Sequence, residues 1–222
     1  MTYAPSASVS DAVATRRSVR AFTDEPVDDG VLADVLAKAG RAPSGGNLQP
    51  WEYVVLTGER RQALIDAVAA RQAMGLAGME VEYPIYPPDL PDPWEARRRG
   101  VGKALYDAMG ITREDREARD AAMRANFTGF GAPVLLMLAT PRLMGPPQWG
   151  DMGIWLGTVM LLLREAGLDS CPQEAWAMYG ATVRRACGWG EDMIFWTGLA
   201  IGHRDAAAAV NNFPVPRRDG SA

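Results

Sequence analysis

Apolar residues follow two different spacings along the chain, and the change between them predicts helices alternating with strands. Between Asp28 and Gly40 the apolar positions recur every three or four residues, which is the spacing of one helical face. The residues on that face are Leu32, Val35, Leu36 and Ala39. A shorter helix is expected before it, capped by Ser10 and running toward Arg17.

Continuous apolar runs mark the expected strands of a buried sheet. Three runs are rich in aromatic, β-branched or leucine residues and have the length of central strands. They cover residues 51–57, 133–140 and 193–202. Further helices are expected over residues 59–76, 94–109, 112–125, 148–167 and 173–187. We therefore expect a single domain of the α/β or α+β class over residues 1–222.

The expected helix over residues 148–167 is apolar on all sides between Asp151 and Arg164. A helix of this kind must be buried all round its circumference. In a domain of modest size this favours packing against a second copy of the chain, and so a homodimer. A helix buried entirely within one chain is the competing interpretation.

Residues 75–128 have the character of an insertion over the core. Within them, residues 79–93 carry five prolines, a density that excludes any regular element. A charged helical pair follows. The segment is a candidate lid over a site, and an ordinary surface excursion is an equal alternative.

Composition narrows the class of protein. The chain has 222 residues, 48% of them hydrophobic and 23% charged, as in soluble globular proteins. A net charge of −4 with no basic stripe argues against nucleic-acid binding. The longest apolar run is too short to span a membrane, and no signal pattern is present at the start, so we expect a cytoplasmic protein.

Few side chains are available for metal or nucleophilic chemistry. Cys171, Cys187 and His203 are the soft or imidazole groups, too few for a structural zinc site or a disulfide framework. Ser44 could serve a hydrolase, yet no base lies at a recognisable spacing from it. We therefore expect the difficult chemistry to be supplied by a cofactor, with no metal and no catalytic side chain.

Two motifs indicate which cofactor. Arg16, Arg17, Ser18 and Arg20 gather three guanidinium groups and a hydroxyl, which suits a phosphate. The turn from Pro43 to Trp51 combines two glycines with the amides of Asn47 and Gln49, which suits the edge of a flat ring. Together they favour flavin mononucleotide (FMN). Taken alone, the arginines could be a solvated helix end and the turn a plain connection.

No G-x-G-x-x-G motif follows a strand, so a Rossmann domain for NAD(P)H is not expected. A nicotinamide would then have to stack on the flavin in the cleft that the substrate later occupies. Ping-pong kinetics follow from that arrangement.

The order and spacing of several motifs resemble the nitroreductase family of FMN-dependent flavoproteins. The motifs are R-R-S-V-R from Arg16, A-P-S-G-G-N-x-Q-P-W from Ala42 with the strand after it, D-x-G-I from Asp151, G-L-D-S-C-P-Q from Gly167 and G-L-A-I-G from Gly198. The resemblance covers most of the chain. It implies an α+β sandwich with a mostly antiparallel sheet, whose C-terminal edge strand comes from the partner in a homodimer with two FMN sites at the interface.

The resemblance also implies residues that bind the cofactor. Arg16, Arg17, Ser18 and Arg20 would hold the phosphate and ribityl chain, and Arg217, or in another register Arg218, would close over the phosphate. Pro43, Ser44 and Asn47, with Gln49 nearby, would meet the flavin from the other subunit. Pro172, Gln173, Glu174 and Ala175 would lie along the ring, with the backbone N–H of Ala175 or Glu174 donating to N5. Tyr83, Tyr86 and Trp94 of the insertion are weaker candidates for lining a substrate pocket.

The resemblance implies that the chain reduces nitroaromatic or quinone-like acceptors with NADH or NADPH. Reductive dehalogenation and flavin fragmentation are alternatives within the family. A flavin-binding storage protein without turnover is the alternative from a different class.

Overall fold

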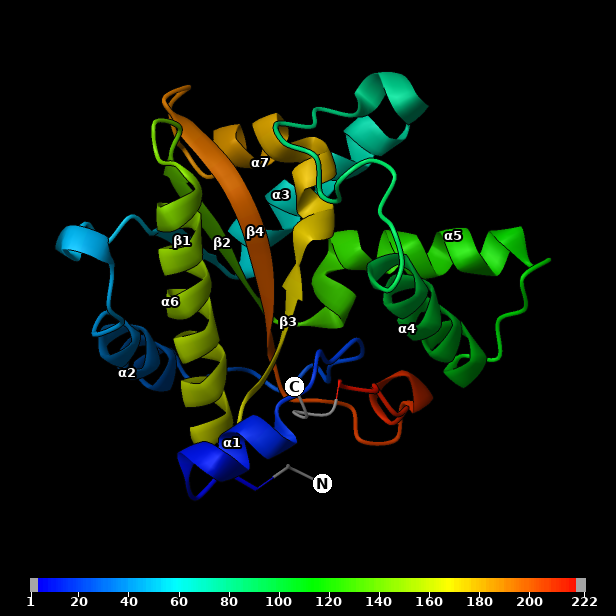
Figure 1. The fold of residues 1–222 in the computed structure, drawn as a ribbon, viewed down its shortest axis with the longest axis horizontal. Coiled ribbons are helices and arrows are strands. Elements are labelled where there is room, and N and C mark those ends of the chain that lie inside the picture. The colour runs from blue at the N-terminus through cyan, green and yellow to red at the C-terminus, as the bar shows by residue number, and fades with distance from the viewer. Residues whose placement is uncertain (1–3, 219–222) are drawn as a thin grey trace.

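The computed structural model describes residues 4–218 and shows one four-stranded sheet with helices on both faces (Figure 1). The strands are β1 (Glu52–Leu56), β2 (Val134–Pro141), β3 (Asp169–Gln173) and β4 (Met193–Gly202). The α-helices are α1 (Val9–Thr15), α2 (Asp29–Ala39), α3 (Gly58–Gln72), α4 (Trp94–Ala108), α5 (Arg116–Arg124), α6 (Pro146–Glu165) and α7 (Gly180–Ala186). Short 3-10 helices are η1 (Gly45–Asn47), η2 (Gly75–Gly78), η3 (Ala125–Gly131), η4 (Glu174–Tyr179) and η5 (Ala209–Asn211).

The sheet has the strand order β1-β2-β4-β3, and every neighbouring pair is antiparallel. The expected mostly antiparallel α+β sheet is therefore confirmed. Its two central strands, β2 and β4, are buried along almost their whole length. Their continuous apolar sequence follows from this burial, because both faces of a central strand are covered.

Alternate residues of β2 supply two separate cores, one on each face of the sheet. Leu136 and Leu138 point to the side covered by α2 and α6, where they pack with Trp155. Leu135 and Met137 point to the opposite side, which is covered by α3, α7 and η4. The two-residue period of a strand produces this division. The three predicted strands, which became β1, β2 and β4, are confirmed.

Two local predictions are wrong. The first helix is capped by Ser8 and not Ser10, since the Ser8 hydroxyl accepts a 3.1 Å hydrogen bond from the Asp11 N–H. The expected helix over 173–187 is replaced by the end of β3, followed by η4 and α7. Pairing with β4 imposes the strand, and nothing in the local sequence of residues 169–173 signals it.

The proline-rich part of the insertion, residues 79–93, forms no helix or strand, as predicted. Long-range ion pairs attach it to the body of the domain. Glu82 pairs with Arg142 at 2.6 Å and with Arg184 at 3.5 Å. Glu80 pairs with Arg71 at 3.2 Å and Arg185 at 3.0 Å. Beyond these anchors, α4 and α5 lie to one side of the sheet and bury no residue fully (Figure 1).

One face of α6 is open. Ile154 is 47% exposed, and a Cβ added to Gly150, Gly153 or Gly157 would meet no atom within 4 Å. The alternative of a helix buried entirely within one chain is therefore wrong. Within residues 4–218, no helix combines the length and apolar character needed to cross a membrane.

Candidate functional site

The predicted arginine cluster occupies an extended segment beside β3. After α1 ends at Thr15, Ser18 forms a parallel bridge with Ser170, and the N–H of Val19 donates to the Ser170 carbonyl at 3.1 Å. Val19 is completely buried, so it anchors the segment in the core. Its neighbours Ser18 and Arg20 are left half-buried at the surface of a cavity.

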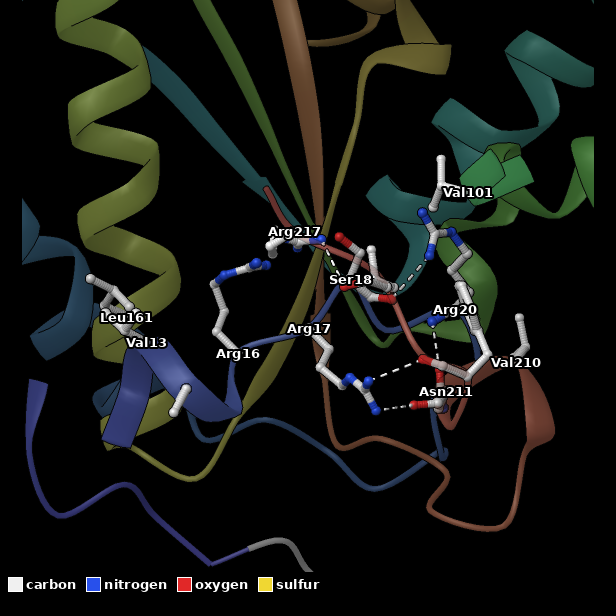
Figure 2. Close-up of a pocket in the computed structure, with 13 residues that line it drawn as sticks. Val13, Arg16, Arg17, Ser18, Arg20, Val101, Leu161, Val210, Asn211 and Arg217 are labelled. Atoms are coloured by element: carbon white, nitrogen blue, oxygen red, sulfur yellow. Dashed lines mark hydrogen bonds between the residues drawn. The ribbon is translucent and has the colours of Figure 1, made fainter. Parts of the chain in front are cut away.

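The C-terminal segment is fastened to this cluster through Asn211, which is buried. The Asn211 Oδ1 accepts a 2.8 Å hydrogen bond from the Arg20 N–H, and its Nδ2 donates to the carbonyls of Ala21 and Asp205. Arg17 donates to the carbonyl of Phe213 at 3.0 Å. The guanidinium of Arg17 therefore holds the tail, while the other arginines of the cluster face the cavity (Figure 2).

The cluster lines a cavity of about 530 Å³ with a strong positive charge. Its cationic residues are Arg16, Arg17, Arg20 and Arg217, and no carboxylate is among the described residues that line it. Burial lowers the pKa of Arg16, and the charge of Arg217 lowers it further. Arg218 does not line the cavity. An anionic group such as a phosphate fits here, because it would neutralise charges that now repel one another.

A second cavity of about 590 Å³, the ring cavity, adjoins the first. The two cavities share Arg20, Val101 and Phe213 as lining residues. The ring cavity is mostly apolar and is bordered by the loop that holds all four predicted residues, Pro172, Gln173, Glu174 and Ala175. The structure therefore brings the arginine cluster and this loop together, although about 150 residues separate them in the sequence.

The start of η4 lies at the ring cavity, since Glu174 and Ala175 line it. No side chain caps this helix, so the first N–H groups, beginning at Glu174 and Ala175, have no capping partner. Burial raises the pKa of the Glu174 carboxyl. The Gln173 side chain, by contrast, is engaged within the protein: it donates to the Asn126 carbonyl at 2.7 Å and accepts from the Trp176 Nε1 at 3.2 Å.

The three aromatic residues predicted for the substrate pocket lie in different places. Tyr86 lines the ring cavity. Tyr83 and Trp94 are not among its lining residues: the Tyr83 hydroxyl donates to the Trp196 carbonyl, and Trp94 is exposed. The pKa of the Tyr83 hydroxyl is raised by burial and by the nearby charges of Glu174 and Glu82.

The Gly-Gly-Asn turn, with Pro43, Ser44, Asn47 and Gln49, lines neither cavity of its own chain. It follows α2 and lies beyond α6 from the insertion helices (Figure 1). Gly46, Asn47 and Gln49 all have positive φ angles, of 59°, 57° and 50°. The carboxylate of Asp151 on α6 accepts a 3.1 Å hydrogen bond from the Gly45 N–H, which fixes the turn. The predicted amides of Asn47 and Gln49 are therefore exposed and lie outside both cavities of this chain.

The model of the family described as "Nitroreductase family" matches residues 13–203. The chain belongs to the nitroreductase family. It is 30% identical to the nitrobenzene nitroreductase of Ectopseudomonas oleovorans over 211 residues, which cover 95% of this chain and 93% of that one.

Two crystal structures of nitroreductase family members share the fold closely. The FMN and NADPH-dependent nitroreductase NfnB from sphigopyxis sp. strain HMH is 62% identical, with a TM-score of 0.94 over 95% of each chain. The FMN-dependent NfnB from Mycobacterium smegmatis, solved in complex with NADPH, is 32% identical, with a TM-score of 0.89 over 94% of this chain and 93% of that one.

Two polar residues that line these cavities were not predicted from the sequence. Asn211 organises the tail, and Arg98 of α4 lines the ring cavity. Asn211 lies in a segment without periodicity, so its sequence signal is limited to the Asn-Asn pair before Phe213. Arg98 lies in a run of three arginines that has the pattern of a solvated helix face.

Proposed function

We propose that this protein is an FMN-dependent nitroreductase that uses NADPH to reduce small nitroaromatic compounds. The observation that carries the proposal is the junction of a cavity rich in arginine with an apolar cavity beside uncapped backbone donors. A phosphate at one end and a flat heteroaromatic ring at the other match this pair of environments. Solved relatives whose names state FMN and NADPH dependence support the proposal.

Different residues of the chain bind different parts of FMN in this proposal. Arg16, Ser18, Arg20 and Arg217 bind the phosphate, and Arg17 acts by holding the tail that carries Arg217. The loop from Pro172 to Ala175 orients the ring, with a backbone N–H of Glu174 or Ala175 directed to N5. Bound there, FMN supplies hydride transfer from NADPH to the acceptor. The protein contributes hydrogen-bond donors and a mostly apolar cavity.

A homodimer completes the site in this proposal. The Pro43–Gln49 turn of one chain would reach the ring bound by the other, with Ser44, Asn47 and Gln49 at the flavin edge. The open face of α6, around Ile154 and three glycines, supplies the contact between copies. We include the exchange of the C-terminal edge strand in the same proposal. The outer edge of β1, which has no neighbouring strand among the described residues, is the edge that would receive it.

The segment over residues 75–128 acts as a lid that sets which acceptors fit. Its apolar and aromatic side chains in the ring cavity include Ile85, Tyr86, Val101 and Met123. Tyr83 and Trp94 remain our predictions for acceptor contacts once a second chain is present. Acceptor size would then be limited by these side chains and not by the sheet.

An anaerobic titration tests the proposed function. Purified protein is loaded with FMN, and its visible absorbance is followed as NADPH and then nitrobenzene are added. We expect the flavin band to bleach with NADPH and to return with the nitroarene. A band that never bleaches would indicate a storage protein, and a band that bleaches without returning would indicate a different acceptor class. Product inhibition competitive with NADPH would support the ping-pong order.

A further inference from the structure

Charged residues are few around the ring cavity. Of the described residues that line it, three carry charge: Arg20, Arg98 and Glu174. Arg20 belongs to the arginine cluster, and Glu174 lies on the loop from Pro172 to Ala175. Arg98 comes from α4, outside the cluster, and binding a neutral nitroarene does not call for a fixed cation there.

We propose that Arg98 binds the 2′-phosphate of NADPH and thereby makes the enzyme prefer NADPH to NADH. This inference rests on the proposed function, since it concerns the reductant that enters the same cavity. An arginine near the adenosine ribose accommodates this phosphate in other nucleotide-binding folds as well. The 2′-phosphate is the group that distinguishes the two nucleotides.

The position of Arg98 suits a group that remains near solvent. Its side chain is 48% exposed although it lines the cavity, so it lies at the opening rather than at the floor. The guanidinium carbon lies 5.5 Å from the centre of the Tyr86 ring, which lines the same cavity. An aromatic ring beside a guanidinium offers a stacking surface next to a phosphate contact.

The present partner of Arg98 does not prevent this contact. Arg98 forms two hydrogen bonds to Glu95, of 2.7 and 2.8 Å, one turn earlier on α4. An exposed ion pair on one helix contributes little to stability, so it can be exchanged at low cost. A phosphate carries more charge than a carboxylate and matches the guanidinium fork in the same bidentate way. Before the nucleotide binds, Glu95 holds the Arg98 guanidinium in an ordered position.

Neighbouring arginines provide a matched control. Arg97 is on the same helix and exposed, but it does not line the ring cavity. It has no ion pair or hydrogen bond among the described side chains. Arg97→Ala therefore removes the same charge from α4 without touching the proposed phosphate site.

The experiment compares wild type, Arg98→Ala and Arg97→Ala, all loaded with FMN. Two quantities are measured: kcat/KM for NADPH and for NADH with one nitroarene, and the Kd for adenosine 2′,5′-bisphosphate and for 5′-AMP by calorimetry. We expect wild type to prefer NADPH. Arg98→Ala should lower kcat/KM for NADPH about tenfold or more, leave that for NADH unchanged, and weaken the bisphosphate by a similar factor. Arg97→Ala should change neither ratio.

An unchanged NADPH/NADH ratio in Arg98→Ala, an equal shift in Arg97→Ala, or a wild type without preference would each overturn the inference. In all three cases normal FMN content and turnover with NADH would leave the proposed function standing. Failure of the proposed function has a different signature, because neither nucleotide would then bleach the flavin in any of the three proteins.

Discussion

The Gln173 side chain joins the loop from Pro172 to Ala175 to the insertion by donating a 2.7 Å hydrogen bond to the Asn126 carbonyl. Its other end accepts from the Trp176 indole, and the side chain is only 2% exposed. Asn126 of η3 lines the ring cavity, and so does Gln173, the last residue of β3. The Gln173 amide is therefore engaged within the protein, and we expect it to position the loop beside the cavity that Gln173 also lines. Its contact with the cofactor stays a prediction.

Gln173→Leu should lower the free energy of unfolding by about 2 kcal/mol, because it leaves a buried indole N–H and a carbonyl without partners. Urea denaturation measures this change. Gln62→Leu is the control, since Gln62 makes an exposed hydrogen bond to Asp66 and its loss should have little effect. The visible spectrum of bound FMN should also shift in Gln173→Leu. Equal stability losses in the two variants would remove Gln173 from this role.

The buried carboxylate of Asp169, the first residue of β3, leads to a second prediction about stability near the site. It accepts from Arg204 Nε at 2.7 Å and from Arg164 Nη1 at 3.3 Å, and all three side chains are at most 3% exposed. Asp169→Asn should lower the free energy of unfolding by about 3–5 kcal/mol, because two buried guanidinium groups lose the carboxylate that balances their positive charge. Thermal unfolding of the apo-protein measures it. Asp34→Asn, which breaks the exposed pair with Lys38, should leave stability unchanged. A stable Asp169→Asn variant would contradict the account.

Glu80 predicts a pH dependence of stability. Burial alone would raise its pKa, but hydrogen bonds from Thr182 and Arg185 and the charge of Arg71 outweigh burial, so the pKa is lowered. A carboxyl whose pKa is lowered in the folded state stabilises the fold above its unfolded pKa, about 4.3. That stabilisation is lost as pH falls through the lower, folded pKa.

Glu80→Gln should therefore lose about 1 kcal/mol of stability at pH 7 relative to wild type. The difference should shrink as the pH falls below about 4. Denaturant curves from pH 7 down to pH 3 measure it. Glu191→Gln is the control, because the Glu191 side chain is exposed and has no ion pair among the described residues. A difference between Glu80→Gln and wild type that does not change with pH would rule out this electrostatic explanation.

Arg16→Ala should have opposite effects on FMN binding and on the stability of the apo-protein. The variant should bind FMN about tenfold to a hundredfold more weakly, since a charge-assisted contact to phosphate is lost. The melting temperature of its apo form should be equal to or above that of wild type, because burial and Arg217 now disfavour the Arg16 charge.

Arg218→Ala serves as the control for Arg16→Ala. Arg218 directly follows Arg217, which lines the cavity with Arg16, but Arg218 does not line it. It should change neither FMN affinity nor melting temperature. If Arg16→Ala destabilises the apo-protein and leaves FMN affinity intact, Arg16 has a structural role and does not bind phosphate.

Features that depend on residues close together in the sequence could be predicted. The central strands β2 and β4 are recognisable in the sequence as continuous apolar runs. The arginine cluster is recognisable because all its members lie within five residues. Strand β3 was missed, because Asp169, Ser170 and Gln173 are polar and Pro172 interrupts the run. Its burial becomes possible through partners such as Arg204, 35 residues away.

Side-chain contacts between residues far apart in the sequence could not be predicted. The attachment of the insertion depends on Glu82 and Arg142, which are 60 residues apart, and on carbonyls such as that of Trp196. No local pattern pairs one carboxylate with one guanidinium among 27 acidic and 23 basic residues. The contribution of Asn211 to the cluster is also invisible locally, since 191 positions separate it from Arg20.

The central claim is that two copies of this chain bind two molecules of FMN. Native mass spectrometry of the protein after incubation with FMN and removal of the excess tests it most directly. We predict one dominant species that contains two chains and two FMN molecules. A monomer, or a dimer that keeps no FMN, would contradict the account.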